Sequence, residues 1–180
     1  MGVMMNETIN TEHEIHEIAL KIKEELIKRG EMMATAESCT GGLIASSIVN
    51  EAGSSAILKG GIVAYQNEVK HDLLGVDSEI LEKYGAVSEQ TVKAMAEGAR
   101  KLFNCEWAVA TSGIAGPTGA EPGKPVGTVW MCVANSLQNE IFCEIFTGNR
   151  GQLREKSVLK IMSKLLFLLN NQKSTCTKVH

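Results

Sequence analysis

The feature that most constrains the fold is an alternation of short apolar runs with helical patterns, separated by glycine-rich turns. Apolar runs at residues 31–36, 60–65 and 107–110 are typical of buried strands. Two β-rich runs, 126–134 and 140–146, are joined by a polar stretch and indicate an antiparallel hairpin. Strands that alternate with helices favour a layered α/β protein. We therefore predict a three-layer α/β/α sandwich with a mostly parallel sheet and an antiparallel hairpin at one side.

Helical spacing and capping residues predict the helices between these strands. Thr11 and Glu14 form a capping-box pattern, and Gly30 ends the helix that follows. Further helices are expected over residues 43–49, after the caps Asn67, Ser78 and Ser88, and from Asn149 to about Asn170. A chain of 180 residues with 44% hydrophobic composition fits one domain. We expect a flexible tail at 1–10, one domain at 11–170 and a polar tail at 171–180.

Composition and missing motifs exclude several classes of function. The net charge of −3 and the lack of a basic run argue against nucleic-acid binding. The longest apolar run, residues 165–169, is too short to span a membrane, and the polar N-terminus is unlike a secretion signal. Five cysteines without a C-x-x-C pair are typical of reduced cytoplasmic thiols. No Walker loop, G-x-G-x-x-G or cluster of metal ligands is present, so we expect no cofactor and no metal.

Ser38 lies where a predicted strand gives way to a helix, at the edge of the sheet where such folds bind ligands. Thr40, Gly41 and Gly42 follow it, and free N–H groups at such a turn suit an oxyanion or a phosphate. The alternative is that Ser38 only caps the next helix. Cys39 is a rival nucleophile, because a thiol at a helix N-terminus has a lowered pKa; its base could only be His71.

Lys70 and Tyr65 are candidates to assist a nucleophile. Lys70 lies in the first turn of a predicted helix, where the helix dipole and partial burial favour the uncharged amine, a possible general base. Ser–Lys pairs are a known variant of triad chemistry. Tyr65 ends the preceding strand and could relay a proton. The alternatives are a solvated surface lysine and a tyrosine at the edge of the core.

The segment 112–117 and Arg150 are candidates for ligand binding. The small residues of 112–117 allow a backbone to approach a ligand closely, and Arg150 stands at the start of a predicted helix, where it could bind a phosphate. An ordinary long turn and an ordinary exposed arginine remain the alternatives.

Five motifs occur in order along the chain: AESCTGG at 36–42, YQNEVK at 65–70, GAVSE at 85–89, SGIAGP at 112–117 and KPVGTV at 124–129. Together they resemble the CinA C-terminal domain family, the nicotinamide-nucleotide amidases. The resemblance covers about residues 12–169.

The resemblance implies hydrolysis of nicotinamide mononucleotide (NMN) to nicotinate mononucleotide and ammonia, without a cofactor. It assigns the nucleophile to Ser38, with assistance from Lys70 and Tyr65. It also implies a substrate pocket lined by the glycine-rich loops and by the arginine after Asn149. The residues expected to bind substrate are Thr40, Gly41, Gly42, Asn67, Ser112, Gly113, Ala115, Gly116 and Arg150.

The chain resembles the stand-alone form of the family, which lacks the N-terminal molybdopterin-binding-like module of full-length CinA proteins. The resemblance and the apolar residues of the last helix lead us to expect a homo-oligomer in the cytoplasm. The alternative function is a pyridine-nucleotide sensor that binds the same ligand without turnover.

Overall fold

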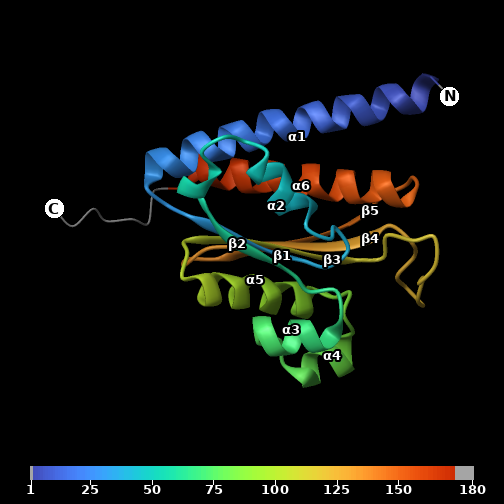
Figure 1. Cartoon of the computed structure of the whole chain (residues 1–180). Coiled ribbons are helices and arrows are strands. Elements are labelled where there is room, and N and C mark those ends of the chain that lie inside the picture. Colours follow the sequence, from blue (N-terminus) through green and yellow to red (C-terminus); the bar gives the residue numbers. More distant parts are fainter. Residues whose placement is uncertain (1, 173–180) are drawn as a thin grey trace.

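The computed structural model describes residues 2–172, in which helices and strands alternate along most of the chain (Figure 1). The strands are β1 (Met33–Glu37), β2 (Leu58–Val63), β3 (Trp107–Gly113), β4 (Thr128–Ala134) and β5 (Asn139–Ile145). The helices are α1 (Gly2–Arg29), α2 (Leu43–Val49), the 3₁₀ turn η1 (Ser54–Ala56), α3 (Asn67–Leu74), α4 (Ser78–Tyr84), α5 (Glu89–Phe103) and α6 (Arg150–Asn171).

The five strands form one sheet in the order β2-β1-β3-β4-β5. β1 pairs in parallel with both β2 and β3, whereas β4 is antiparallel to β3 and to β5. The predicted mostly parallel sheet with an antiparallel hairpin at one side is therefore confirmed. Because β1, β2 and β3 are parallel, the loops that follow them leave the same edge of the sheet, and this edge positions the site.

Helices cover both faces of the sheet, which confirms the predicted three layers (Figure 1). On one face lie α2 and α6, with α1 packed outside them; on the other lies α5, with α3 and α4 outside it. Two apolar cores fill the spaces between the layers. Trp107 and Ile44 belong to the core under α2 and α6, and Val92 and Met95 belong to the core under α5.

The apolar C-terminal part of α6 is buried on two sides, by the sheet and by α1. Leu165, Leu168 and Leu169 are buried, whereas Phe167 is 58% exposed. Contacts within this chain therefore cover most of the apolar surface from which we expected self-association. Among residues 2–172, no helix is long and apolar enough to cross a membrane.

Three predicted helix boundaries agree with the capping residues. Gly30 follows the last residue of α1 with a φ of 65°, Ser88 caps α5 through the N–H of Thr91, and Asn149 forms a capping box with Gln152 at the start of α6. Glycine adopts this φ without the clash of a Cβ atom.

Three predicted helix starts were wrong. α1 begins at Gly2 rather than at Thr11, because no proline or internal glycine in residues 3–10 breaks the helix before the capping box. Asn67 and Ser78 are first helical residues, since Gln66 and Asp77 occupy the cap positions. The predicted C-terminal tail lies mostly outside the described residues, which end at 172.

Candidate active site

A pocket of about 310 Å³ opens at the edge of the sheet where β1, β2 and β3 end. Its size is at the lower end of the usual range for small-molecule sites. It brings together segments that are up to 112 residues apart in the chain, from Ser38 to Arg150. The lining residues are Ser38, Cys39, Tyr65, Lys70, Ala86, Val87, Ser112, Gly113, Ile114, Ala115, Gly116, Thr118, Gly119 and Arg150.

Ser38 stands at the first position of a tight turn between β1 and α2. Its N–H donates to the carbonyl of Thr111 over 2.9 Å, and its own carbonyl accepts from the N–H of Gly41 over 3.2 Å. Its hydroxyl forms no hydrogen bond with any of residues 2–172. Ser38 is 9% exposed and lines the pocket. Its hydroxyl does not cap α2, because Gly42 occupies the cap position. The helix-capping alternative is therefore not what the structure shows.

Thr40, Gly41 and Gly42 build this turn and do not line the pocket. Gly41 and Gly42 have φ values of 62° and 91°, a left-handed conformation that a Cβ atom would strain. Thr40 is fully buried, and its hydroxyl contacts the Glu37 carboxylate and the Thr111 hydroxyl, each at 2.7 Å. These three residues, which we expected to bind substrate, instead shape the turn that holds Ser38.

Lys70 is almost completely buried, with 1% of its surface exposed. It lies in α3, and its Nζ donates to the carbonyls of Ala64 and Tyr65 over 2.9 Å and 3.1 Å. Burial lowers the pKa of the Lys70 ammonium below its ordinary value of 10.5. The surface-lysine alternative is wrong, and Lys70 lies on the pocket wall together with Ser38.

Tyr65 and Arg150 meet at the opening of the pocket. The Tyr65 ring is exposed, and its phenol oxygen accepts from Nη2 of Arg150 over 3.1 Å. The other terminal nitrogen of Arg150 donates to the carbonyl of Gly116 over 2.8 Å. The phenol therefore orients Arg150 and has no hydrogen bond to Ser38 or Lys70. The backbone carbonyl of Tyr65, not its side chain, contacts the lysine.

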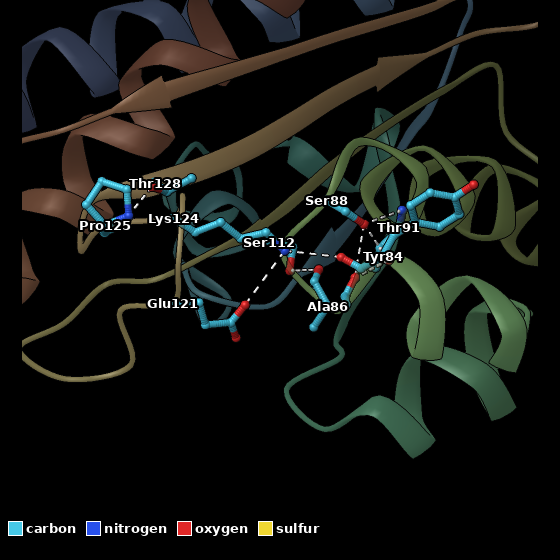
Figure 2. Close-up of polar contacts among 10 residues, drawn as sticks. Tyr84, Ala86, Ser88, Thr91, Ser112, Glu121, Lys124, Pro125 and Thr128 are labelled. Carbon is cyan, nitrogen blue, oxygen red and sulfur yellow. Dashed lines mark hydrogen bonds and ion pairs between the residues drawn. The ribbon is translucent and has the colours of Figure 1, made fainter.

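The end of β3 is joined to the turn between α4 and α5 (Figure 2). The buried hydroxyl of Ser112 donates to the carbonyl of Ala86 over 2.7 Å, and this bond fixes the wall that Ala86 and Val87 provide. Farther along the loop, Lys124 donates to the carbonyl of Tyr84 over 3.1 Å (Figure 2). Gly113, Ala115 and Gly116 line the pocket as predicted.

Two further candidates, Asn67 and His71, also lie outside the pocket. Asn67 is exposed and borders a separate surface hollow with Glu68, His71 and Asp72. Nδ1 of His71 lies 2.8 Å from the carbonyl of Val76. Neither Asn67 nor His71 lines the pocket that Ser38 and Cys39 line, so the geometry does not support His71 as a base for Cys39.

Cys39 lines the pocket but is a poor nucleophile. It is 6% exposed, and burial raises the pKa of its thiol to about 12. A thiol with such a pKa is protonated near neutral pH, whereas the thiolate is the reactive form. The geometry therefore favours the serine over the adjacent cysteine.

Some residues of the site were not predicted from the sequence. Glu37 lies fully buried under the Ser38 turn, and Arg154 of α6 donates to the carbonyl of Thr40 over 2.7 Å. Val87 and Thr118 complete the wall of the pocket. Glu37 is the last residue before the candidate nucleophile, and a charged side chain at the end of an apolar strand was the available signal. Within residues 2–172, no group of three or more His, Cys, Asp or Glu residues could hold a metal ion.

Comparisons with known proteins agree with this architecture. A CinA-like protein of Fervidobacterium nodosum is 46% identical over 148 residues, which cover 81% of this chain, and one of Mycolicibacterium gilvum is 48% identical over 139 residues, or 76%. Only 35% and 32% of those relatives are covered, so the chain spans about a third of their length.

Solved structures of similar proteins superpose closely. The competence damage-inducible protein A of Klebsiella pneumoniae has a TM-score of 0.86 at 35% identity, over 88% of this chain and 99% of that one. The competence/damage inducible protein CihA of Agrobacterium tumefaciens has a TM-score of 0.81 at 39% identity, over 87% and 96%. The family model of the CinA C-terminal domain matches residues 15–169, and the chain belongs to this family.

Proposed function

We propose that the protein is an amidase that hydrolyses the carboxamide of NMN to nicotinate mononucleotide and ammonia, with Ser38 as the nucleophile. The observation that carries the proposal is the presence of Ser38 and the buried Lys70 in one pocket, with Arg150 at its opening. A hydroxyl, a basic amine and a cation that suits a phosphate are the groups such a substrate requires.

The hydrogen bonds of Lys70 suit a general base. An uncharged amine has two N–H bonds and one lone pair. The carbonyls of Ala64 and Tyr65 accept two N–H bonds from Nζ, so the lone pair of the neutral form is free to take a proton. Burial lowers the pKa of Lys70 and increases the fraction of this form near neutral pH. Lys70 thus supplies the base without a histidine.

The reaction follows from these groups. Ser38 Oγ attacks the carboxamide carbon while Lys70 Nζ takes the hydroxyl proton. The carbon–nitrogen bond of the resulting tetrahedral oxyanion breaks, and Lys70 returns the proton to the leaving ammonia. Water then attacks the ester on Ser38 by the reverse route and releases the carboxylate and the free serine. Donors for the oxyanion come from the turn that follows Ser38.

The charges of the pocket favour an anionic substrate. Arg150 carries a permanent positive charge, Lys70 is the other basic residue among those that line the pocket, and no carboxylate is among them. Arg150 is held by Tyr65 and Gly116 with its guanidinium at the opening. A phosphate at this position gains charge-assisted hydrogen bonds, whereas the riboside without phosphate does not. We therefore expect preference for the nucleotide.

A nucleotide-binding protein without turnover is the second candidate. One observation favours it: Lys70 Nζ is hydrogen-bonded to backbone carbonyls and not to Ser38 Oγ. Such a protein binds the nucleotide through Arg150 and the loop of residues 114–119 without releasing ammonia.

The test is ammonia release by the purified protein from NMN and from nicotinamide riboside, without added metal. The amidase releases ammonia from NMN with a lower KM than from the riboside. Cys39→Ala serves as the control, because the buried thiol takes no part in the reaction, and it keeps kcat within about threefold. Binding of NMN without any ammonia release would contradict the amidase and support the nucleotide-binding protein.

A further inference from the structure

The carboxylate of Glu37 is the most fully bonded polar group near the site. The side chain is completely buried. Its Oε2 accepts from the Thr40 hydroxyl at 2.7 Å, from the N–H of Gly42 at 2.9 Å and from the N–H of Ile44 at 3.1 Å. Its Oε1 accepts from the N–H of Ala45 at 2.9 Å. Four donors from one turn and the start of α2 thus converge on one side chain.

Among the side chains of residues 10–172, no basic group forms an ion pair with Glu37. A buried carboxyl group is unfavourable unless hydrogen bonds satisfy its oxygens. The four donors supply these bonds. The side chain of Glu37 therefore binds the turn tightly to the end of β1, in the residue directly before Ser38.

These bonds determine which N–H groups of the turn are left for a ligand. The amide of Gly41 is bonded to the Ser38 carbonyl, and that of Gly42 is bonded to Glu37. The amide of Cys39, which lines the pocket, has no backbone or side-chain oxygen partner among the described residues. It follows the nucleophile directly, where a donor for an oxyanion is needed.

Arg154 holds the same turn from its outer side. Its Nη2 and Nε donate to the carbonyl of Thr40 over 2.7 Å and 3.2 Å. Thr40 is thus held at two points, its hydroxyl by the Glu37 carboxylate and its carbonyl by the arginine. The direction of the Cys39 amide, one residue earlier in the same turn, depends on these restraints.

We propose that Glu37 is a positioning residue of the active site, which holds the turn so that the amide of Cys39 faces the oxyanion of the transition state. The proposal rests on the proposed amidase function. Because the oxyanion exists in the transition state and not in the bound substrate, loss of this positioning lowers kcat and leaves KM nearly unchanged. A residue needed only for folding would change stability without this separation.

The experiment compares Glu37→Gln with Glu106→Gln. The side-chain amide introduced by Glu37→Gln keeps one carbonyl oxygen for the Oε2 donors but presents an NH₂ group to the N–H of Ala45, so the turn loosens on that side. Glu106 is the matched control, because its carboxylate also accepts a backbone N–H, that of Met32 at 2.8 Å, at the opposite edge of the sheet.

We expect Glu37→Gln to lower kcat for NMN about 10- to 100-fold with KM within about twofold, since loss of one oxyanion donor lowers kcat by roughly 10²–10³ in other enzymes. Glu106→Gln keeps both parameters within about twofold. If Glu37→Gln does not fold, Thr40→Val removes one donor from the carboxylate and lowers kcat about three- to tenfold. An unchanged kcat in a folded Glu37 or Thr40 variant, or a change in KM alone, would overturn the proposal.

Amide hydrogen exchange of the segment 38–45 separates this proposal from the proposed function. Exchange becomes faster in Glu37→Gln and stays as in the wild type in Glu106→Gln, because only the former weakens the bonds to Gly42, Ile44 and Ala45. Faster exchange in a protein whose wild type releases no ammonia would overturn the amidase while upholding Glu37 as the residue that orders the turn. Unchanged exchange would overturn that ordering role.

Discussion

The turn of residues 38–42 and the loop of residues 114–125 both contribute residues to the pocket, but they differ in how firmly hydrogen bonds hold them. In the turn, buried hydrogen bonds hold Thr40 and Gly42 to Glu37, and Ser38 to Gly41 and Thr111. In the loop, residues 117–123 are all exposed. The loop is held at its base, where Ile114 bonds to Thr128 and Gly127, and at two further points: Arg150 bonds to the carbonyl of Gly116, and Lys124 bonds to Tyr84 (Figure 2).

The difference indicates that the two segments have different functions. A nucleophile and its oxyanion donors must be held within a fraction of an ångström of the reacting atoms, and a fully bonded turn meets this requirement. A loop that closes over a nucleotide must admit and release it, and such segments have few buried contacts. We therefore expect changes near the turn to act on kcat, and changes in the loop to act on KM.

Among the variants that test this comparison, we expect the largest loss of activity for Lys70→Met, which removes the proposed base next to the turn. We expect kcat to fall about 10³-fold with little change in KM, because general-base catalysis contributes about 10²–10⁴. In the wild type, kcat/KM rises with pH and levels off below 10.5, because burial lowers the pKa of Lys70 and the uncharged amine is the active form. A pH profile unchanged by the substitution would contradict the assignment.

The same burial makes stability depend on pH. The pKa of Lys70 is lower in the folded protein than the 10.5 of the ordinary lysine, so the unfolded chain binds more protons between these two values. The free energy of unfolding of the wild type relative to Lys70→Met therefore rises with pH through that window. Equilibrium unfolding in urea at several pH values measures it, and a relative stability that falls with pH would contradict the buried position.

The next largest effect is expected when one glycine in each segment is replaced by alanine. Gly42 has a φ of 91° and Gly123 has a φ of 76°, so alanine is strained at both positions. In the rigid turn the strain cannot relax, and we expect Gly42→Ala to destabilise the protein by about 1–2 kcal/mol and to lower kcat. In the loop no atom lies within 4 Å of an added Cβ at Gly123, and we expect less than about 1 kcal/mol. Urea unfolding and kinetics of the two variants test this, and equal effects would break the comparison.

The smallest effect is expected for Lys124→Met, which removes the bond between the loop and the α4–α5 turn. Because this contact is near the surface, stability should change by well under about 1 kcal/mol. We expect KM for NMN to rise two- to fivefold with kcat unchanged, which steady-state kinetics can measure. A lower kcat with unchanged KM would show that the loop, like the turn, positions reacting groups.

The sequence predicted the order of strands and helices well, because the glycine turns and the apolar periods are local signals. Gly30 and Ser88 were correct caps, since each acts through its own backbone or side chain. Asn67 and Ser78 were wrong by one position, because Gln66 and Asp77 were also able to occupy the cap position. A capping pattern fixes a helix start only to within a few residues.

The residues of the candidate site that the resemblance named could be predicted from the sequence. The contacts between residues far apart in the chain could not. Ser38, Tyr65, Lys70 and Arg150 lie together in the pocket, although they come from four segments of the chain. The sequence suggested partial burial of Lys70 but not its nearly complete burial, because most lysines are exposed. The contact of Arg154 with Thr40 joins residues 114 positions apart, and no local pattern predicts such a pair.

The most direct test of the central claim, that the rigid turn carries the nucleophile, removes one hydroxyl from each segment: Ser38→Ala from the turn and Thr118→Val from the loop. We predict that Ser38→Ala binds NMN but releases ammonia at less than about a thousandth of the wild-type rate, while Thr118→Val keeps kcat within about threefold. A Ser38→Ala variant that retains a tenth of the wild-type rate, or a Thr118→Val variant as impaired as Ser38→Ala, would contradict the account.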